Sequence, residues 1–357
     1  MVTECFSMAF RVRGRSGADG ESGGRRAPGT LRVRTRLAGW ACALGLALSL
    51  AACDAPVRQP LAVGVNTWVG YDPLVLARDR ALVDPLRVKV VEVISSAEAL
   101  SHLRNGLLDA AALTLDETLR LADSGFDVRI VALLDTSTGA DVVLAAPRVT
   151  SLQKLRGESI AVEDSTLGML ILERLLRMAG LARGDVTVLQ MDATLHKTAL
   201  LSDRVAAAIS YAPIDGPIRE LGFRPIFDSR QMPGDIVDVL VVRAEVLSQR
   251  PDDVDALLHA WATGLSALEV DPVGASAQLA PGVDMLPAQY RAVLEGLRFH
   301  TPAESLALLG GDPPALAGQS QNMVQLLTQL KLLQRSPRWA DLVDASPARR
   351  VADEAAP

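Results

Sequence analysis

From residue 61 onward, short apolar segments alternate with longer segments of helical periodicity. The apolar segments carry Val, Leu and Ile on consecutive positions, as strands do when both of their faces are covered. They lie at residues 61–65, 88–93, 110–113 and 128–134, and helical patterns at 73–82, 97–105 and 115–124 separate them. This order predicts an α/β fold with a mostly parallel sheet and helices on both faces.

The alternation restarts after Pro147, which predicts a second lobe. Its strands are expected at residues 159–162, 186–189, 206–209 and 225–227, with a long helix at 167–179. From Glu245 the pattern is helical only. Two strand-like segments, 142–145 and 236–242, are expected to cross between the lobes and form a hinge. We therefore expect residues 61–144 and 243–340 in lobe 1, residues 145–242 in lobe 2, and a frayed polar tail at 341–357.

An internal similarity links the two predicted lobes. Residues 109–116 and 205–212 each combine an alanine-rich strand, a hydroxyl residue and the start of a helix, 96 to 97 positions apart. The repeat indicates either structural pseudo-symmetry or a coincidence of alanine-rich strands.

The segment before residue 53 has the form of an export signal. Three arginines, Arg32, Arg34 and Arg36, precede seventeen uncharged residues that end in Leu50-Ala51-Ala52-Cys53, a length that is marginal for a membrane span. This end resembles the bacterial lipobox, whose cysteine becomes lipidated. Asp54 resembles the signal for retention on the inner membrane. We expect a signal peptide at 1–52, a lipidated tether at 53–60 and a location on the periplasmic side of the inner membrane; residues 1–30 are expected to be disordered or to precede the true start.

Cleavage at this position makes the remaining chain acidic and free of disulfides. Cys5 and Cys42 would be removed, which leaves Cys53 alone. The first 52 residues hold eight of the 36 basic and three of the 42 acidic residues, so 28 and 39 remain, a net charge of −11. This charge disfavours nucleic acid as a partner, and membrane contact is expected through the lipid anchor only.

Ligands of open parallel sheets bind beyond the carboxyl ends of the strands, so the loops at those ends hold the candidate site residues. These loops carry hydroxyls, carboxylates and aromatic rings, although aromatic residues make up only 4% of the chain. The candidates for ligand binding are Trp68, Tyr71, Thr114, Asp116, Asp135, Glu163, Ser165, Thr166, Tyr211 and Asp238. Alternatively, each loop aromatic fills the edge of its own lobe.

The charge of the ligand stays open at this point. Ser165 and Thr166 precede a helix, so one of them is expected to cap it, and the free amides there form an anion site. The acids Asp116, Asp135, Glu163 and Asp238 favour an amine instead, helped by aromatic faces, or they complement helix dipoles. A zwitterion or a neutral ring with polar edges would suit both sets.

Known enzyme motifs are absent from the sequence that follows the predicted signal peptide. This part contains no Gly-x-Ser-x-Gly, phosphate loop, Gly-x-Gly-x-x-Gly, His-Glu-x-x-His or Cys-x-x-Cys pattern. The histidines, His102, His196, His259 and His300, are scattered over predicted helices. We therefore expect no catalytic residue, no metal site and no cofactor.

Several segments carry a resemblance to a known family over residues 61–333. Its most specific parts are Trp68-Val69-Gly70-Tyr71 and the segment from Pro233 to Arg243. Further matches are Asn105 to Ala111, Gly139-Ala140-Asp141 and Leu152 to Gly157. These segments resemble the substrate-binding lipoproteins of ABC importers in the nitrate, sulfonate and taurine group. One departure is Tyr211-Ala212-Pro213, where relatives often have an aromatic or hydroxyl residue followed by Glu-Pro.

The resemblance implies the two-lobed periplasmic binding protein fold of type II, closure on a small solute, and delivery to a permease driven by an ATPase. It points to a site at Trp68 and Tyr71, Thr114 through Asp116, Ser165 and Thr166, and near Tyr211. We expect a monomer. The solute is expected to be a sulfonate, an amine or a pyrimidine. A tethered ligand sensor and an enzyme related to thiamine-pyrimidine synthases are the alternatives.

Overall fold

A computed structural model describes residues 59–354. The predicted signal peptide and the lipidation site Cys53 lie outside the described residues, and so do the last three residues of the predicted tail.

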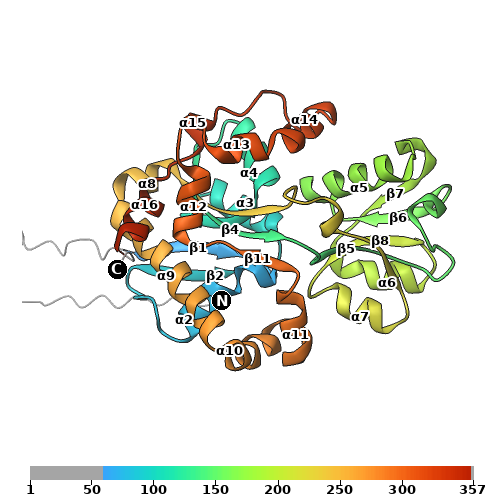
Figure 1. The fold of residues 1–357 in the computed structure, drawn as a ribbon, viewed down its shortest axis with the longest axis horizontal. Helices are drawn as coiled ribbons and strands as arrows, with labels where there is room; N and C mark the ends of the chain where they lie inside the picture. The colour runs from blue at the N-terminus through green and yellow to red at the C-terminus, as the bar shows by residue number, and fades with distance from the viewer. Residues whose placement is uncertain (1–58, 355–357) are drawn as a thin grey trace, which may run out of the picture. The chain divides into compact units, whose positions relative to one another are not determined.

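The first sheet has six strands in the order β11-β4-β10-β3-β1-β2 (Figure 1). They are β1 (Leu61–Val65), β2 (Val88–Glu92), β3 (Ala110–Thr114), β4 (Val128–Ser137), β10 (Val237–Arg243) and β11 (Leu297–Phe299). β1 runs parallel to β2 and β3, whereas β10 runs antiparallel to both β3 and β4. All five residues of β3 are buried, because this strand lies inside the sheet with both faces covered.

The second sheet has five strands in the order β7-β6-β8-β5-β9. They are β5 (Asp141–Ala145), β6 (Ser159–Val162), β7 (Thr187–Gln190), β8 (Ala207–Tyr211) and β9 (Arg224–Asp228). β6 is parallel to β7 and β8, and β5 is antiparallel to β8 and β9. Together the two sheets and their helices confirm the two-lobed α/β fold predicted from the sequence.

The strand order explains the internal similarity as structural pseudo-symmetry. β3 lies between a parallel neighbour, β1, and an antiparallel one, β10. β8 lies in the same way between β6 and β5. The two similar segments therefore occupy equivalent positions in the two sheets, each beside a strand that runs antiparallel to it.

The connections between the lobes differ from the predicted ones. β5 pairs only within the second sheet and β10 only within the first, so neither strand crosses between lobes. The crossing segments are instead the turn between Ser137 and Asp141 and the stretch between Asp228 and Val237. Hydrophobicity could not locate these boundaries because it marks a strand without showing which sheet the strand joins, and the partners of β5 and β10 lie far away in the chain. We propose lobe boundaries inside these two segments, in place of positions 144/145 and 242/243.

Helices cover both sheets. The first lobe has α2 (Asp72–Asp79), α3 (Ser96–Arg104) and α4 (Leu115–Asp123), and the second has α5 (Thr166–Ala179), α6 (His196–Leu201) and α7 (Asp215–Glu220). Ser165 caps the start of α5, and Gly180 ends it in the left-handed conformation with φ +66°, as both residue types favour. α5 buries Leu172, Leu175, Leu176 and Ala179 at helical spacing.

The chain after β10 is mostly helical and belongs to the first lobe. Its elements are α8 (Ala244–Gln249), α9 (Pro251–Val270), α10 (Pro272–Leu279), α11 (Pro287–Leu294), α12 (Pro302–Leu309), α13 (Ala315–Gln319) and α14 (Gln321–Gln329). α9 packs directly on α2, and its Trp261 is fully buried. α13 and α14 meet at Ser320.

The prediction of a frayed tail at residues 341–357 is wrong for the part that the structure describes. α15 (Trp339–Leu342) and α16 (Ser346–Glu354) follow α14, and α16 packs on α9 and α12. Ala348 and Val351, three positions apart, are buried. Two apolar side chains on one face suffice to dock a short helix, although the segment as a whole is polar.

Candidate functional site

A small cavity of about 40 Å³ lies between the two lobes and is lined by side chains of both. It is bounded by Asn66, Trp68, Tyr71, Ser96, Thr114, Glu117, Asp141, Glu163, Ser165, Leu167, Tyr211, Ile236 and Asp238. Four of the parallel strands, β1, β3, β6 and β8, point their carboxyl ends at it, since Asn66, Thr114, Glu163 and Tyr211 are at or just after those ends. This is the edge at which open α/β sheets bind ligands.

Two aromatic rings meet across the cavity. Trp68, from the loop after β1, and Tyr211, at the end of β8, have ring centroids 5.9 Å apart at an interplanar angle of 74°. This edge-to-face contact is a favoured geometry for aromatic pairs, and it joins a residue of the first lobe to one of the second. Because the partner of each ring belongs to the other lobe, neither ring merely fills an edge of its own lobe.

Tyr71 and two aspartates form a buried polar group beneath Trp68. The Tyr71 hydroxyl donates to Oδ1 of Asp238 at 2.6 Å, and Trp68 Nε1 donates to Oδ2 of Asp135 at 3.3 Å. Burial raises the pKa of Asp135 to about 7 and that of Asp238 well above its usual range, where repulsion from Asp135 adds to the effect. The two carboxyl groups therefore hold a proton at neutral pH that isolated aspartates would lose.

Thr114 and Glu117 form a capping box at the start of α4. Thr114 Oγ1 accepts from the Glu117 amide, and Glu117 Oε2 accepts from the Thr114 amide at 3.3 Å. Ser96 Oγ also donates to Glu117 Oε1 at 2.6 Å. Burial raises the pKa of Glu117. Asp116 is fully buried and does not line the cavity; burial, followed by repulsion from Glu117, raises its pKa to about 8.

The second lobe contributes Glu163 and Asp141 to the cavity wall. The Tyr211 hydroxyl donates to Glu163 Oε1 at 3.4 Å. Burial raises the pKa of Glu163, and it raises the pKa of Asp141 to about 7. Asp141 is 4% exposed, and its Oδ2 has no hydrogen-bond partner among the residues that the structure describes.

The two hydroxyl residues before α5 have different roles. Ser165 Oγ accepts from the Gly168 amide at 3.0 Å, so Ser165 is the predicted cap, and it also lines the cavity. Thr166 does not line the cavity. Its hydroxyl accepts from Arg120 Nη1 of α4 at 3.3 Å, a contact between the two lobes.

The structure thus brings seven of the ten predicted residues to the cavity and leaves Asp116, Asp135 and Thr166 behind it. It adds residues that were not predicted: Asn66, Ser96, Glu117, Asp141, Leu167 and Ile236. Glu117 had a readable signal, because Thr114-x-x-Glu117 is a capping-box sequence. Asp141 had none beyond its place in a motif, since its position depends on how β5 joins the second sheet.

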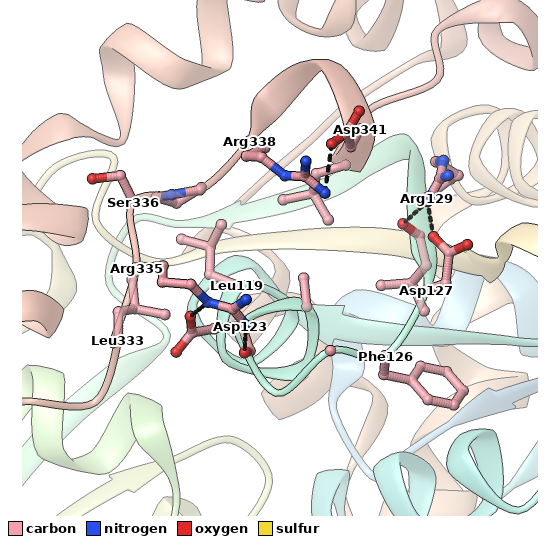
Figure 2. Close-up of a pocket in the computed structure, with 15 residues that line it drawn as sticks. Leu119, Asp123, Phe126, Asp127, Arg129, Leu333, Arg335, Ser336, Arg338 and Asp341 are labelled. Carbon is pink, nitrogen blue, oxygen red and sulfur yellow. Dashed lines mark hydrogen bonds and ion pairs between the residues drawn. The ribbon is translucent and has the colours of Figure 1, made fainter.

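A larger cavity of about 720 Å³ lies elsewhere on the first lobe, between the end of α4, the start of β4 and the segment before α15. Figure 2 shows that its charged residues pair with one another: Arg335 with Asp123, Arg129 with Asp127, and Arg338 with Asp341. Opposite charges are thus matched, in contrast to the cavity between the lobes.

Within residues 59–354, every helix is too short or too polar to span a membrane. Within the same residues, no group of three or more His, Cys, Asp or Glu side chains is arranged to hold a metal ion.

The chain has two lobes, and strand ends of both lobes converge on a site between them. This arrangement is the fold of two-lobed solute-binding proteins. The sequence profile described as NMT1/THI5-like matches residues 84–275, more than half of the chain. The chain belongs to this NMT1/THI5-like family.

Curated relatives match a shorter segment. A protein of Brucella abortus (strain 2308), named only as a candidate binding protein, is 27% identical over 139 residues, which are 36% of this chain and 42% of the relative. The match therefore spans less than half the length of the curated relatives.

Solved structures share the fold over most of both chains. The zinc-bound ligand-binding component of an ABC-type import system from Staphylococcus aureus has a TM-score of 0.70 at 15% identity, covering 82% of this chain and 99% of that one. The alkanesulfonate-binding protein SsuA from Xanthomonas axonopodis pv. citri, bound to MOPS, gives 0.68 at 18%, covering 80% and 99%. The desulfurization enzyme DSZB gives 0.62 at 16%, covering 83% and 99%. These likenesses confirm the predicted periplasmic binding protein fold.

Proposed function

We propose that this protein is the extracytoplasmic solute-binding component of an ABC import system, which captures a small polar organic solute and delivers it to a permease driven by an ATPase. The observation that carries this proposal is the cavity between the lobes, whose wall comes from both sheets. A solute that contacts both lobes stabilises their closed arrangement, since only differential affinity shifts a conformational balance.

The volume of the cavity is consistent with a protein whose lobes open and close around a solute. A water molecule needs roughly 10–15 Å³ of such space, so 40 Å³ holds only a few waters. An organic solute therefore requires the lobes to move apart around the segments 138–140 and 229–236. Two such connections side by side act as a hinge.

Seven of the predicted residues form the proposed ligand contacts together with Glu117 and Asp141. They are Trp68, Tyr71, Thr114, Glu163, Ser165, Tyr211 and Asp238. Asp116, Asp135 and Thr166 are proposed as supporting residues behind the cavity wall. Cys53 is proposed as the lipid anchor on the periplasmic side of the inner membrane, with the protein a monomer there.

Binding and transport can be tested separately. Thermal-shift screening of the chain from residue 54 with sulfonates, amines, amino acids, pyrimidines and nitrate should reveal a ligand, because a ligand at 100 times its Kd adds about 2.7 kcal/mol. Deletion of the gene should then abolish uptake of that solute. A screen with no stabilising solute would contradict the binding function, and unchanged uptake in the deletion strain would contradict transport and favour the tethered sensor.

A binding protein rather than an enzyme is proposed, although the desulfurization enzyme DSZB shares the fold. The distinguishing experiment is incubation of each stabilising solute with the purified protein, followed by mass spectrometry. Recovery of unchanged solute is expected, whereas a stoichiometric excess of product over protein would establish an enzyme.

A further inference from the structure

The charged side chains that line the cavity between the lobes are all acidic. Glu117, Asp141, Glu163 and Asp238 contribute to its wall, and Lys, Arg and His are not among the lining residues. Asp135 lies directly behind this wall, held by Trp68. Buried like charges repel one another and are costly unless a counter-charge is present.

Uncharged groups donate hydrogen bonds to some of the carboxylate oxygens in this acidic wall. Both oxygens of Glu117 accept hydrogen bonds, from Ser96 Oγ at 2.6 Å and from the Thr114 amide at 3.3 Å. Asp238 accepts from Tyr71 at 2.6 Å. These donors satisfy hydrogen bonding but carry no positive charge, so a carboxylate that ionises here has no counter-charge among the lining residues.

Asp141 is the carboxylate that lacks a hydrogen bond which a ligand could donate. It begins β5, directly opposite Tyr211 in the antiparallel register, and it is 4% exposed. Its Oδ2 lacks a hydrogen-bond partner among the described residues, and the side chain lines the cavity. A buried acceptor without a donor is costly, and more so when it is charged, so a ligand that donates to it removes this cost.

The aromatic residues suit the same chemistry. Trp68, Tyr71 and Tyr211 all line the cavity, and aromatic faces attract cations, most strongly where water is excluded. The capping bond from Gly168 to Ser165 already uses one amide at the start of α5, which leaves fewer donors for an anion. Donors for a sulfonate or carboxylate are thus few, whereas acceptors for a cation are many.

We propose that the solute is an organic cation without an acidic group, and that its protonated nitrogen donates to Asp141 beside the rings of Trp68 and Tyr211. This inference rests on the proposed solute-binding function and specifies its substrate class. It separates this chain from the alkanesulfonate-binding protein of the same fold.

Matched probes test the charge preference. Calorimetry and thermal shift at pH 8 would compare the cations benzylamine and agmatine with the anions benzenesulfonate, ethanesulfonate and nitrate and with the zwitterion taurine. At least one cation is expected to bind at least 100-fold more tightly than every anion and taurine. Tighter binding of an anion or of taurine would overturn the proposal while leaving the solute-binding function intact. Binding of no probe would contradict the cation proposal, and the broader screen above would then decide the binding function separately.

Substitutions test the assigned contact. Asp141→Asn keeps the shape and removes the charge, so the affinity for the bound cation should fall at least 10-fold. Glu269→Gln, at an exposed position of α9 outside the cavity, removes the same charge and should leave affinity unchanged. If Asp141→Asn does not fold, the half-buried Glu163→Gln takes its place, with a loss of at least 3-fold expected. Equal affinity of the folded site variant and the Glu269 control would overturn the role of the acidic wall.

Discussion

At the scale of single residues, Trp68 combines the most contacts that bear on function. Its ring meets Tyr211 of the other lobe, and its Nε1 donates to Asp135. Trp68→Ala should weaken solute binding by about 1–3 kcal/mol, as loss of a central aromatic anchor does, measured by calorimetry with the solute that the screen identifies. Trp339→Ala, at the start of α15 and away from the cavity, is the control. Equal affinity of the two variants would remove Trp68 from the proposed site.

Gly70 lies where there is no space for a larger side chain. A Cβ at this position would lie 2.2 Å from Asp135 Oδ2 and 2.3 Å from Trp68 Nε1, so any larger side chain must separate these two groups. Gly70→Ala should therefore weaken solute binding at least 10-fold, although the substitution adds no charge. Gly216→Ala in α7, where a Cβ has no neighbour within 4 Å, should bind normally. Unimpaired binding by Gly70→Ala would show that the Trp68–Asp135 bond is dispensable.

At the scale of elements, the close packing of α2 on α9 depends on one glycine. A Cβ on Gly264 would lie 1.8 Å from the carbonyl oxygen of Pro73, a backbone atom that moves only with its helix. Gly264→Ala should cost about 1–3 kcal/mol, the usual effect of overpacking, measured as a loss in the free energy of urea unfolding. Gly318→Ala in α13 meets nothing within 4 Å and should stabilise by up to about 1 kcal/mol. If the two substitutions changed the free energy of unfolding by similar amounts, α2 and α9 would be able to move apart at little cost.

The elements also show why sequence predicts some features and not others. Most strands of the two sheets were predictable because a buried parallel strand is a continuous apolar segment with few alternatives. The loops at their carboxyl ends were predictable as site positions because parallel strands end at one edge. The pairing partners of β5 and β10, and hence the position of Asp141, depend on contacts far apart in the chain. β11 and α16 escaped prediction because each has only a few apolar residues, whose burial is decided by the neighbours they meet.

At the scale of the whole molecule, the buried carboxyl groups link folding to pH. Burial raises the pKa of Asp72, Asp135 and Asp141 to about 7 each and that of Asp116 to about 8, against about 3.9 in an unfolded chain. The folded state therefore binds more protons than the unfolded state between these values. Their stabilising contribution is complete below about pH 4 and is lost as the pH rises through 7 to 8, at up to about 1.4 kcal/mol per unit and group. Without ligand, the Tm should fall between pH 5 and pH 8, by about 2–4 °C for each kcal/mol.

A cationic solute should reverse part of this dependence, because it binds the ionised form of Asp141. The charged neighbours of Asp141 are acidic: Asp215 and Glu163 disfavour its ionisation, and Asp116, Asp135 and Asp238 also repel it. Binding of a cation that stays charged over this range, such as agmatine, should therefore tighten as the pH rises from 5 to 8 and should release protons, measured as a dependence of calorimetric enthalpy on buffer ionisation. In Asp141→Asn the ligand-free Tm should fall less steeply with pH, and proton release should shrink. An unchanged pH profile in that variant would mean that the acids behind the wall, rather than Asp141, carry the linkage, because a residue that no longer titrates cannot contribute to it.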